Sequence, residues 1–357
     1  MAPRWVVCVM AAFLLPVASE PVRACSPYER IPGWATLWTT DGPTAAKHPL
    51  TGNVLWGDKP IEDAAVTAGP ACPMTPLNHL GVAIMSRVAR GSLILMGEVH
   101  DNLEHHKLRA GLLPVMPGNS AIVFEQIRAD QQAGLDQFAD FNTKARRPGT
   151  AGDLFRFLDW DNSGWPSSEI YKPLFQAAID AKLPILAGDP SKETLRAVGK
   201  QGEAALAPEE RARLQLDQPL AAALAGALNV ELKEGHCNLL ADSALPRMQQ
   251  VQRFRDATLA DNLLKAAEKH GSAFLIAGNG HVRTDRGVPW YLRQRAPGRK
   301  VVSVMLIEVE DGKTDPQAYV PRDPDGKPAA DYILFTPRAE RADPCAGLEE
   351  KFEKKAG

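Results

Sequence analysis

The segment SLILMGEVH (residues 92–100) joins a short apolar run to a glycine, an acid and a histidine. Three later segments repeat this pattern: SAIVFEQ (120–126), LPILAGD (183–189) and SAFLIAGNGH (272–281). Short apolar runs that end in polar residues are typical of buried strands in open α/β sheets, whose sites lie at the carboxyl ends of the strands. The sequence therefore predicts an α/β fold, with a central, mainly parallel sheet flanked by helices and a site at its carboxyl edge.

Helical patterns separate the strand segments, and the clearest runs from Leu245 to His270 with apolar residues at helical spacing. Shorter helices are expected at 77–89, 104–113, 129–141 and 171–181, and further strands within 52–58, 300–309 and 331–337. Residues 191–245 break the alternation, with Pro208 and Pro219 each at a position that suits the start of a helix. We expect a signal peptide (1–24), an irregular N-terminal wrap (25–76), an α/β domain (77–190 and 246–340), an inserted helical subdomain (191–245) and a C-terminal tail (341–357).

The first 24 residues are typical of a secretory signal peptide. Arg4 precedes a mostly apolar run over residues 5–17, which is too short to span a bilayer. Cleavage after Ser19 or Ala24 satisfies the small-residue rule, and the second choice would leave Cys25 as a site for lipidation, although a charged arginine stands just before Ala24. We expect an exported protein of the periplasm or cell envelope, in contact with a membrane only through such an anchor.

Removal of the signal peptide would leave four cysteines: Cys25, Cys72, Cys237 and Cys345. An even number in an exported chain favours disulfides, but the sequence leaves three pairings open. Lys and Arg number 41 against 43 Asp and Glu, so the formal net charge of the full chain is −2. Because the chain has no basic excess, its charge disfavours nucleic acid as a partner.

The strand ends supply the leading candidates for chemistry. Glu98 and His100 are two positions apart, so an extended backbone points both side chains to one face. Glu125 ends an apolar strand, where a buried carboxylate needs a partner: a metal, a histidine, or an arginine such as Arg255 or Arg128. His281 follows Gly-Asn-Gly, which permits close backbone approach. Glu98, His100, Glu125 and His281 together suit a divalent metal or general acid and base catalysis.

Other histidines and aromatic residues have simpler interpretations. His105 and His106 are adjacent on a helix, so at most one faces the crevice, and exposure to solvent is the simpler interpretation for both. Trp160, Trp165 and Tyr171 would line an apolar pocket for a flat ligand or pack beneath a loop. The sequence has no glycine-rich phosphate loop, no G-x-S-x-G and no H-E-x-x-H motif, which disfavours ATP, dinucleotide and common serine-hydrolase functions.

Several segments resemble the signature blocks of ChaN-type haem-binding proteins, within the wider Tiki and erythromycin-esterase-like superfamily. They are GEVHDNLEHH, the strand ending in FEQ, GWPSSEIYKPL, LPILAGDPSKETLR, HCNLL with PRMQQVQRFRDATLADNL, and LIAGNGHVRTDRGVP, in order between Leu77 and Pro337. The resemblance implies a mainly parallel sheet with a small helical subdomain, an exported or lipid-anchored protein, and an association with iron and haem uptake.

The resemblance also implies that ferric haem is held through a tyrosine, at a site that can be dimeric. Tyr171 lies nearest a family block and Tyr291 is the second candidate, while His100, His281 and Trp165 would complete the haem site. Phenolate is a hard anionic ligand that suits ferric iron, and a nearby histidine or arginine would help to ionise it.

Other branches of the superfamily are hydrolytic, which supports an alternative. Haem binding alone does not explain so many carboxylates and imidazoles at strand ends. In a metal-assisted or general-base hydrolase, Glu98 or His100 would activate water, and Glu125 and His281 would orient it or bind the metal. Both hypotheses require that these four side chains lie together.

Overall fold

The computed structural model describes residues 48–61, 91–113, 119–144, 147–343 and 345–346. Within these ranges an eight-stranded sheet has the order β2-β1-β8-β7-β3-β6-β4-β5. The strands are β1 (Val54–Trp56), β2 (Lys59–Pro60), β3 (Leu93–Met96), β4 (Ser120–Arg128), β5 (Ile185–Asp189), β6 (Ser272–Ile276), β7 (Val301–Glu308) and β8 (Tyr332–Thr336). Neighbouring strands from β8 to β5 are parallel, while β1 pairs antiparallel with both β2 and β8. The predicted α/β fold with a mainly parallel sheet is confirmed.

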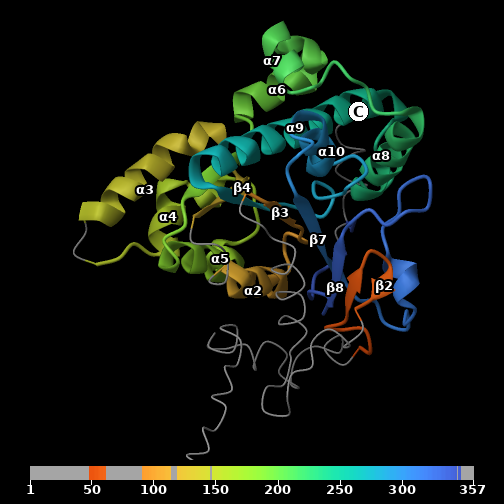
Figure 1. Ribbon diagram of the computed structural model, residues 1–357, viewed down its shortest axis with the longest axis horizontal. Coiled ribbons are helices and arrows are strands. Elements are labelled where there is room, and N and C mark those ends of the chain that lie inside the picture. Colours follow the sequence, from red (N-terminus) through yellow and green to blue (C-terminus); the bar gives the residue numbers. More distant parts are fainter. Residues whose placement is uncertain (1–47, 62–90, 114–118, 145–146, 344, 347–357) are drawn as a thin grey trace, which may run out of the picture.

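Helices cover both faces of the sheet (Figure 1). Helices α2 (Leu103–Leu112), α3 (Gln132–Lys144), α4 (Ala151–Phe157) and α5 (Ser168–Asp180) contribute to one hydrophobic cluster. Helices α9 (Leu245–His270) and α10 (Val288–Arg295) pack in a second cluster on the opposite face. Between β5 and α9 the chain forms α6 (Lys192–Gln201), α7 (Pro208–Arg213) and α8 (Ala222–Gly235), with short 3₁₀ turns. The molecule therefore has three layers in its described part.

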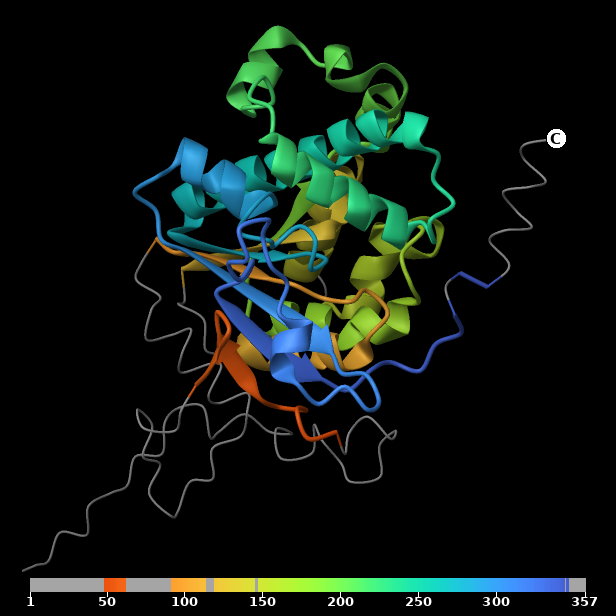
Figure 2. The ribbon, with the colours of Figure 1, turned by 90° about the vertical axis from the view of Figure 1, so that its right-hand side faces the viewer.

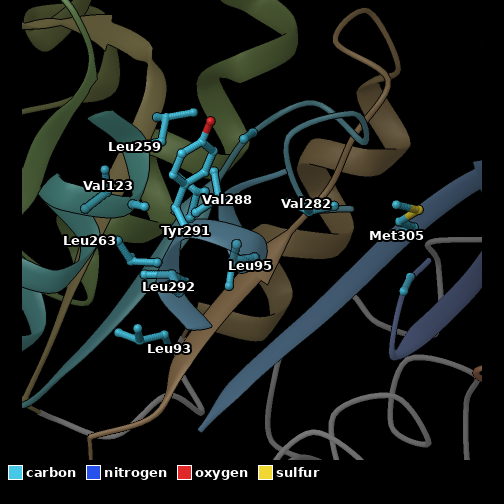
Figure 3. Packing of buried hydrophobic residues seen from close by; sticks show 14 of the residues in the cluster. Leu93, Leu95, Val123, Leu259, Leu263, Val282, Val288, Tyr291, Leu292 and Met305 are labelled. Carbon is cyan, nitrogen blue, oxygen red and sulfur yellow. The ribbon is translucent and has the colours of Figure 1, made fainter. Parts of the chain in front are cut away.

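Strand β3, in the middle of the sheet, is apolar at every position because helices lie on both sides of it. In β3, Ile94 and Met96 belong to the cluster under α2 and α5, while Leu93 and Leu95 belong to the cluster under α9 and α10. Figure 3 shows the latter cluster, with the strand residues against the helix residues Leu263 and Leu292. The uninterrupted apolar run LILM thus reflects burial on two faces, and it ends where the site begins.

The order of the strands brings distant segments together at the carboxyl edge. Strand β6 lies between β3 and β4, and β5 follows on the outer side of β4. Because these four strands are parallel, the segments that follow them share one edge of the sheet. Residues near position 98, 125, 189 and 281 are therefore neighbours in space despite their separation along the chain.

Most predicted elements agree with the structure. The long helix has the predicted bounds, Leu245–His270, and the strand predicted within 52–58 is β1. Helix α5 begins three residues before the predicted start, since Ser167 caps it. The interpretation of Pro219 as the start of a helix is wrong: α8 begins at Ala222, with the alanine-rich run that favours helix more strongly.

Some predictions fall outside the described residues: the signal peptide, the helix at 77–89, and both Cys25 and Cys72. Cys237 forms a disulfide with Cys345, which joins the end of the helical segment 191–245 to the C-terminal tail. Among the described residues, every helix is too short or too polar to cross a bilayer.

Candidate functional site

The four predicted strand-end residues lie together. His100 Nδ1 lies 2.6 Å from Glu98 Oε1, and His100 Nε2 lies 4.0 Å from Glu125 Oε1. The same Glu125 oxygen is 3.2 Å from His281 Nε2. The prediction that acids and imidazoles from distant segments meet at one edge of the sheet is confirmed; their chemical roles remain a prediction.

The segment after β3 presents His100 at the rim of the site. An ionised carboxylate only accepts hydrogen bonds, so His100 donates its Nδ1 proton to Glu98 and keeps a lone pair at Nε2 when neutral. Nε2 has no hydrogen-bond partner among the described residues, and the side chain is 35% exposed. Burial alone would lower the pKa of His100, but Glu125 and the hydrogen bond to Glu98 raise it above its usual value.

Trp165 and Gly278 are neighbours of the His100 ring. Trp165 meets the ring edge to face at 4.8 Å between centroids. Gly278 lies against the other nitrogen, and a Cβ at that position would stand 2.9 Å from His100 Nε2. The glycine of the predicted Gly-Asn-Gly turn is therefore required by close approach, and a larger residue would occupy the space beside the imidazole.

An irregularity in β4 lets two consecutive residues reach the site. The pairing of β4 with β5 shifts between Phe124 and Arg128, as expected for a bulge. Consecutive residues of a regular strand point to opposite faces. Here Glu125 contacts His281, and Gln126 Nε2 donates to Glu98 Oε1 at 2.8 Å.

Glu98 is buried at the back of the site with several donors. Arg109 of α2 forms an ion pair with its second oxygen, and the Tyr171 hydroxyl donates to Oε1 at 3.3 Å. Burial alone would raise the pKa of Glu98, but Arg109 and the hydrogen bond from His100 hold it at about 2. Glu98 is therefore a permanent anion that orients His100.

Glu125 is equally buried and equally well paired. Arg255 Nη2 donates to Oε1 at 2.8 Å, and the backbone N–H of Gly278 donates to Oε2 at 2.7 Å. Burial would raise the pKa of Glu125, but His281 and Arg255 hold it well below its usual range. Of the partners that the sequence left open for Glu125, the structure contains Arg255 and His281, while Arg128 pairs with Asp130.

His281 lies between two carboxylates and is held as a cation. Its Nδ1 donates to Asp256 Oδ1 of α9 at 2.6 Å, and its Nε2 faces Glu125. Burial would lower the pKa of His281, but Glu125 and Asp256 raise it to about 10. Because an imidazolium has no free lone pair, His281 in this state binds an anion and no metal.

The divalent metal expected at Glu98, His100, Glu125 and His281 finds no support in the structure. Among the described residues, no group of three or more histidine, cysteine or acidic side chains has the arrangement of a metal site. The physical reason is that Arg109 and Arg255 already supply the positive charge that buried Glu98 and Glu125 need.

The solvent-exposed interpretation of His105 and His106 is wrong, since both are fully buried. His105 accepts from the backbone N–H of Val99 and contacts Thr336 Oγ1 at 2.7 Å, away from the site. His106 lies toward Glu98, with its Nδ1 3.7 Å from Oε2. Burial and Arg109 lower the pKa of His106 to about 4, so it is neutral. The expectation that at most one of the pair faces the crevice is confirmed.

The two candidate tyrosines are both buried, with 0% exposure. Tyr171 of α5 packs between His106 and Trp160, at 4.0 and 4.9 Å between ring centroids, behind Glu98. Tyr291 of α10 lies in the apolar cluster on the other face of the sheet (Figure 3). Burial raises the pKa of both phenols. Neither tyrosine presents its oxygen to a ligand in this structure.

Sequence reasoning did not select Arg109, Gln126 or Asp256 for the site. Arg109 follows His106 by three residues and therefore shares its face of α2, which is a usable signal. Asp256 interrupts the apolar pattern of α9, and a charged residue on the buried face of a helix indicates a buried partner. Gln126 carries no such signal, because its approach depends on the bulge in β4.

Comparison with known proteins agrees with this architecture. Residues 84–292, more than half of the chain, match the family described as haem-binding uptake, Tiki superfamily, ChaN. Among solved structures, ChaN of Campylobacter jejuni, described with cofacial haem binding, is 18% identical with a TM-score of 0.54, over 79% of this chain and 95% of that one. This likeness supports the fold.

Two other solved structures are less similar. A Bacillus cereus protein is 16% identical with a TM-score of 0.33, over 68% of this chain and 70% of its own. A succinoglycan biosynthesis protein is 13% identical with a TM-score of 0.34, over 68% and 71%. No curated protein matches the chain. On the strength of the family match and the shared fold, this chain belongs to the ChaN family of haem-binding uptake proteins in the Tiki superfamily.

Proposed function

We propose that this chain binds ferric haem at the carboxyl edge of its sheet, with the His100 imidazole as the iron ligand. The observation that carries the proposal is the pair formed by Glu98 and His100, in which a buried anion accepts the Nδ1 proton at 2.6 Å. Such a carboxylate fixes the tautomer and ring orientation of a metal-binding histidine and strengthens its other nitrogen as a donor. Bound haem would supply a ferric iron that the His100 imidazole could ligate.

The surroundings of His100 fit a porphyrin. The imidazole is partly exposed, Trp165 offers an aromatic ring beside it, and Gly278 keeps the space next to Nε2 free of a side chain. Aromatic and apolar walls with a few polar groups are usual for cofactor sites. His281 would act from behind, as a cation that keeps Glu125 in position.

Tyrosine ligation, which the family resemblance implies, is the alternative for the iron. Tyr171 and Tyr291 would have to leave buried positions and ionise against a raised pKa. The partly exposed His100 requires neither change, which favours the imidazole. In our proposal Tyr171 stabilises Glu98 through its hydroxyl, one step removed from the iron.

We further propose that the protein is exported and serves haem or iron uptake at the periplasm or cell envelope. The signal-peptide pattern of residues 1–24 and the disulfide between Cys237 and Cys345 support export, because disulfides persist in oxidising compartments. A lipid anchor at Cys25 and a dimeric site remain part of this proposal, on the sequence pattern and the family resemblance.

Titration of the purified mature chain with haemin tests the iron ligand. We expect a shift of the Soret band in the wild type that is lost in His100→Ala, weakened in Glu98→Gln and kept in Tyr171→Phe. His270→Ala, at the end of α9, is the matched control and should behave as wild type. Loss of the shift in Tyr171→Phe or Tyr291→Phe with His100→Ala unaffected would refute the histidine ligand, and no shift in the wild type would refute haem binding.

A general-base hydrolase is a second candidate, and the same geometry favours it. A histidine oriented by a carboxylate, with its other nitrogen free of a hydrogen bond, can take a proton from water. His100 has this arrangement, and its raised pKa moves its action as a base to higher pH. An ester and amide panel with and without chelator tests the candidate. Activity that is unchanged in His100→Ala and Glu125→Ala excludes it.

A further inference from the structure

Arg255 of α9 is fixed at the rim by two carboxylates and still has donors to offer. Its Nε and Nη2 donate to the two oxygens of Asp189 at 2.9 and 3.1 Å, and Nη2 also donates to Glu125 Oε1 at 2.8 Å. The guanidinium carries five N–H groups, two of them on Nη1. Nη1 has no partner among the described residues, and the side chain is 21% exposed.

Arg255 lies close to the proposed iron ligand. Its Nη2 and the His100 Nε2 both approach Glu125 Oε1, at 2.8 and 4.0 Å. The two nitrogens are therefore at most 6.8 Å apart, the sum of the two distances to the shared oxygen. One ligand of the size of a porphyrin can reach both residues.

The surrounding charges make Arg255 a rigid cation. Asp189, at the end of β5, is 5% exposed and holds the guanidinium in a bidentate pair, which fixes its plane. Asn262 Nδ2 of the same helix donates to the Gly188 carbonyl at 2.9 Å and secures α9 against β5. A planar guanidinium held along one edge presents its other N–H groups in a fixed direction, as suits the recognition of a further carboxylate.

We propose that Arg255 recognises a carboxylate of the ligand: its Nη1 donates a hydrogen bond to a porphyrin propionate, while His100 faces the iron. This inference rests on the proposed haem function and specifies how the site selects a porphyrin acid. Arg255 thereby determines specificity, whereas Asp189 positions it.

The test compares haemin with haemin dimethyl ester, in which both propionates are masked. The wild type should prefer the free acid by at least about tenfold in Kd, the size expected for one charge-assisted hydrogen bond. Arg255→Gln should bind both compounds with nearly equal affinity. Arg196→Gln removes one charge from the exposed surface of α6 and should keep the wild-type preference. Equal affinities in the wild type, or a preference retained in Arg255→Gln, would overturn the inference.

Two further arms separate this inference from the proposed function. If Arg255→Gln does not fold, Arg255→Lys replaces it in the test. The lysine ammonium cannot hold Asp189 and Glu125 and still donate in the same direction, so the preference of this variant for the free acid should fall. An unchanged preference refutes the inference. Protoporphyrin IX and its dimethyl ester repeat the comparison without iron. If the protein prefers free protoporphyrin IX to its dimethyl ester but haemin gives no Soret shift, carboxylate recognition is retained and iron binding is rejected. If haemin gives a Soret shift but the free acids are not preferred, iron binding is retained and carboxylate recognition is rejected.

Discussion

Buried acids at this edge of the sheet are neutralised by arginines from the helices on both faces and by His281 from the turn after β6. Arg109 of α2 pairs with Glu98, while Arg255 of α9 pairs with Glu125. An unpaired carboxylate at either position would be strongly destabilising, so each acid depends on its basic partner. The protein's own groups thus preorganise the site, and among the described residues the partly exposed side chains of His100 and Arg255 each keep one nitrogen without a hydrogen bond.

The raised pKa of His281 predicts how the free energy of unfolding depends on pH. Its pKa is about 10 in the folded protein against 6.5 for the free side chain, so the folded state binds its proton more tightly. That contribution is complete below pH 6.5 and is lost as pH rises through about 10. We expect the free energy of unfolding to decrease across this window in the wild type and to decrease less in His281→Gln, as measured by denaturant unfolding at several pH values. Parallel profiles for the two proteins would contradict the assignment.

Sequence reasoning identified the site residues that carry a local signal. Glu98 and His100 could be paired from their spacing, and His281 from the glycines before it. The partners that set their charges come from α2 and α9, at distances along the chain that no local pattern encodes. For the same reason the sequence could not exclude a metal. Two acids and two histidines give the same sequence pattern whether an arginine or a metal ion neutralises the acids.

At the scale of elements, α2 connects the site to the C-terminal segment through its N-cap. Asn102 Oδ1 accepts from the backbone N–H groups of Glu104 and His105, at 2.9 and 3.3 Å. Its Nδ2 donates to Glu308 Oε1 at 2.7 Å and to the Pro337 carbonyl at 2.9 Å. The same residue therefore starts the helix that carries Arg109 and ties it to β7.

Replacement of this cap should destabilise the protein. We expect Asn102→Ala to lower the free energy of unfolding by about 1–2 kcal/mol for the lost cap, and further because Glu308 loses a donor. Asn102→Ser keeps an acceptor for the helix but removes the amide donors, so it should fall between wild type and alanine. Denaturant unfolding of the three proteins measures this order. Equal stability of the alanine and serine variants would show that the cap contributes nothing.

The elements themselves were largely predictable, since periodicity depends on which face is buried. The bounds of α9 followed from its apolar spacing, and the four buried strands from their uninterrupted apolar runs. The bulge in β4 and the missing helix start at Pro219 were not predictable. The bulge depends on how β5 pairs with β4 in the folded chain, whereas α8 begins at Ala222 because the alanine run favours helix more strongly than the position of Pro219 does.

At the scale of the whole molecule, the C-terminal segment links both sides of the site. Arg341 donates to Asp101, next to His100, and to Glu308 of β7. Four residues later Cys345 is joined to Cys237, which follows α8. Helix α8 in turn contacts the turn after His281, where Glu231 pairs with Arg286. Figure 2 shows this segment, in dark blue, along the right-hand side of the molecule.

Breaking the disulfide should therefore weaken the whole molecule. Cys237 and Cys345 are 108 residues apart, and a crosslink over a loop of this length restricts the unfolded chain strongly. We expect the Cys237→Ser, Cys345→Ser double variant to lose about 2–4 kcal/mol of unfolding free energy relative to the oxidised wild type. Denaturant unfolding with and without reductant measures the loss. Reduction should bring the wild type to the level of the double variant and should leave the variant itself unchanged; a wild-type midpoint that reductant does not move would show that the crosslink contributes no stability.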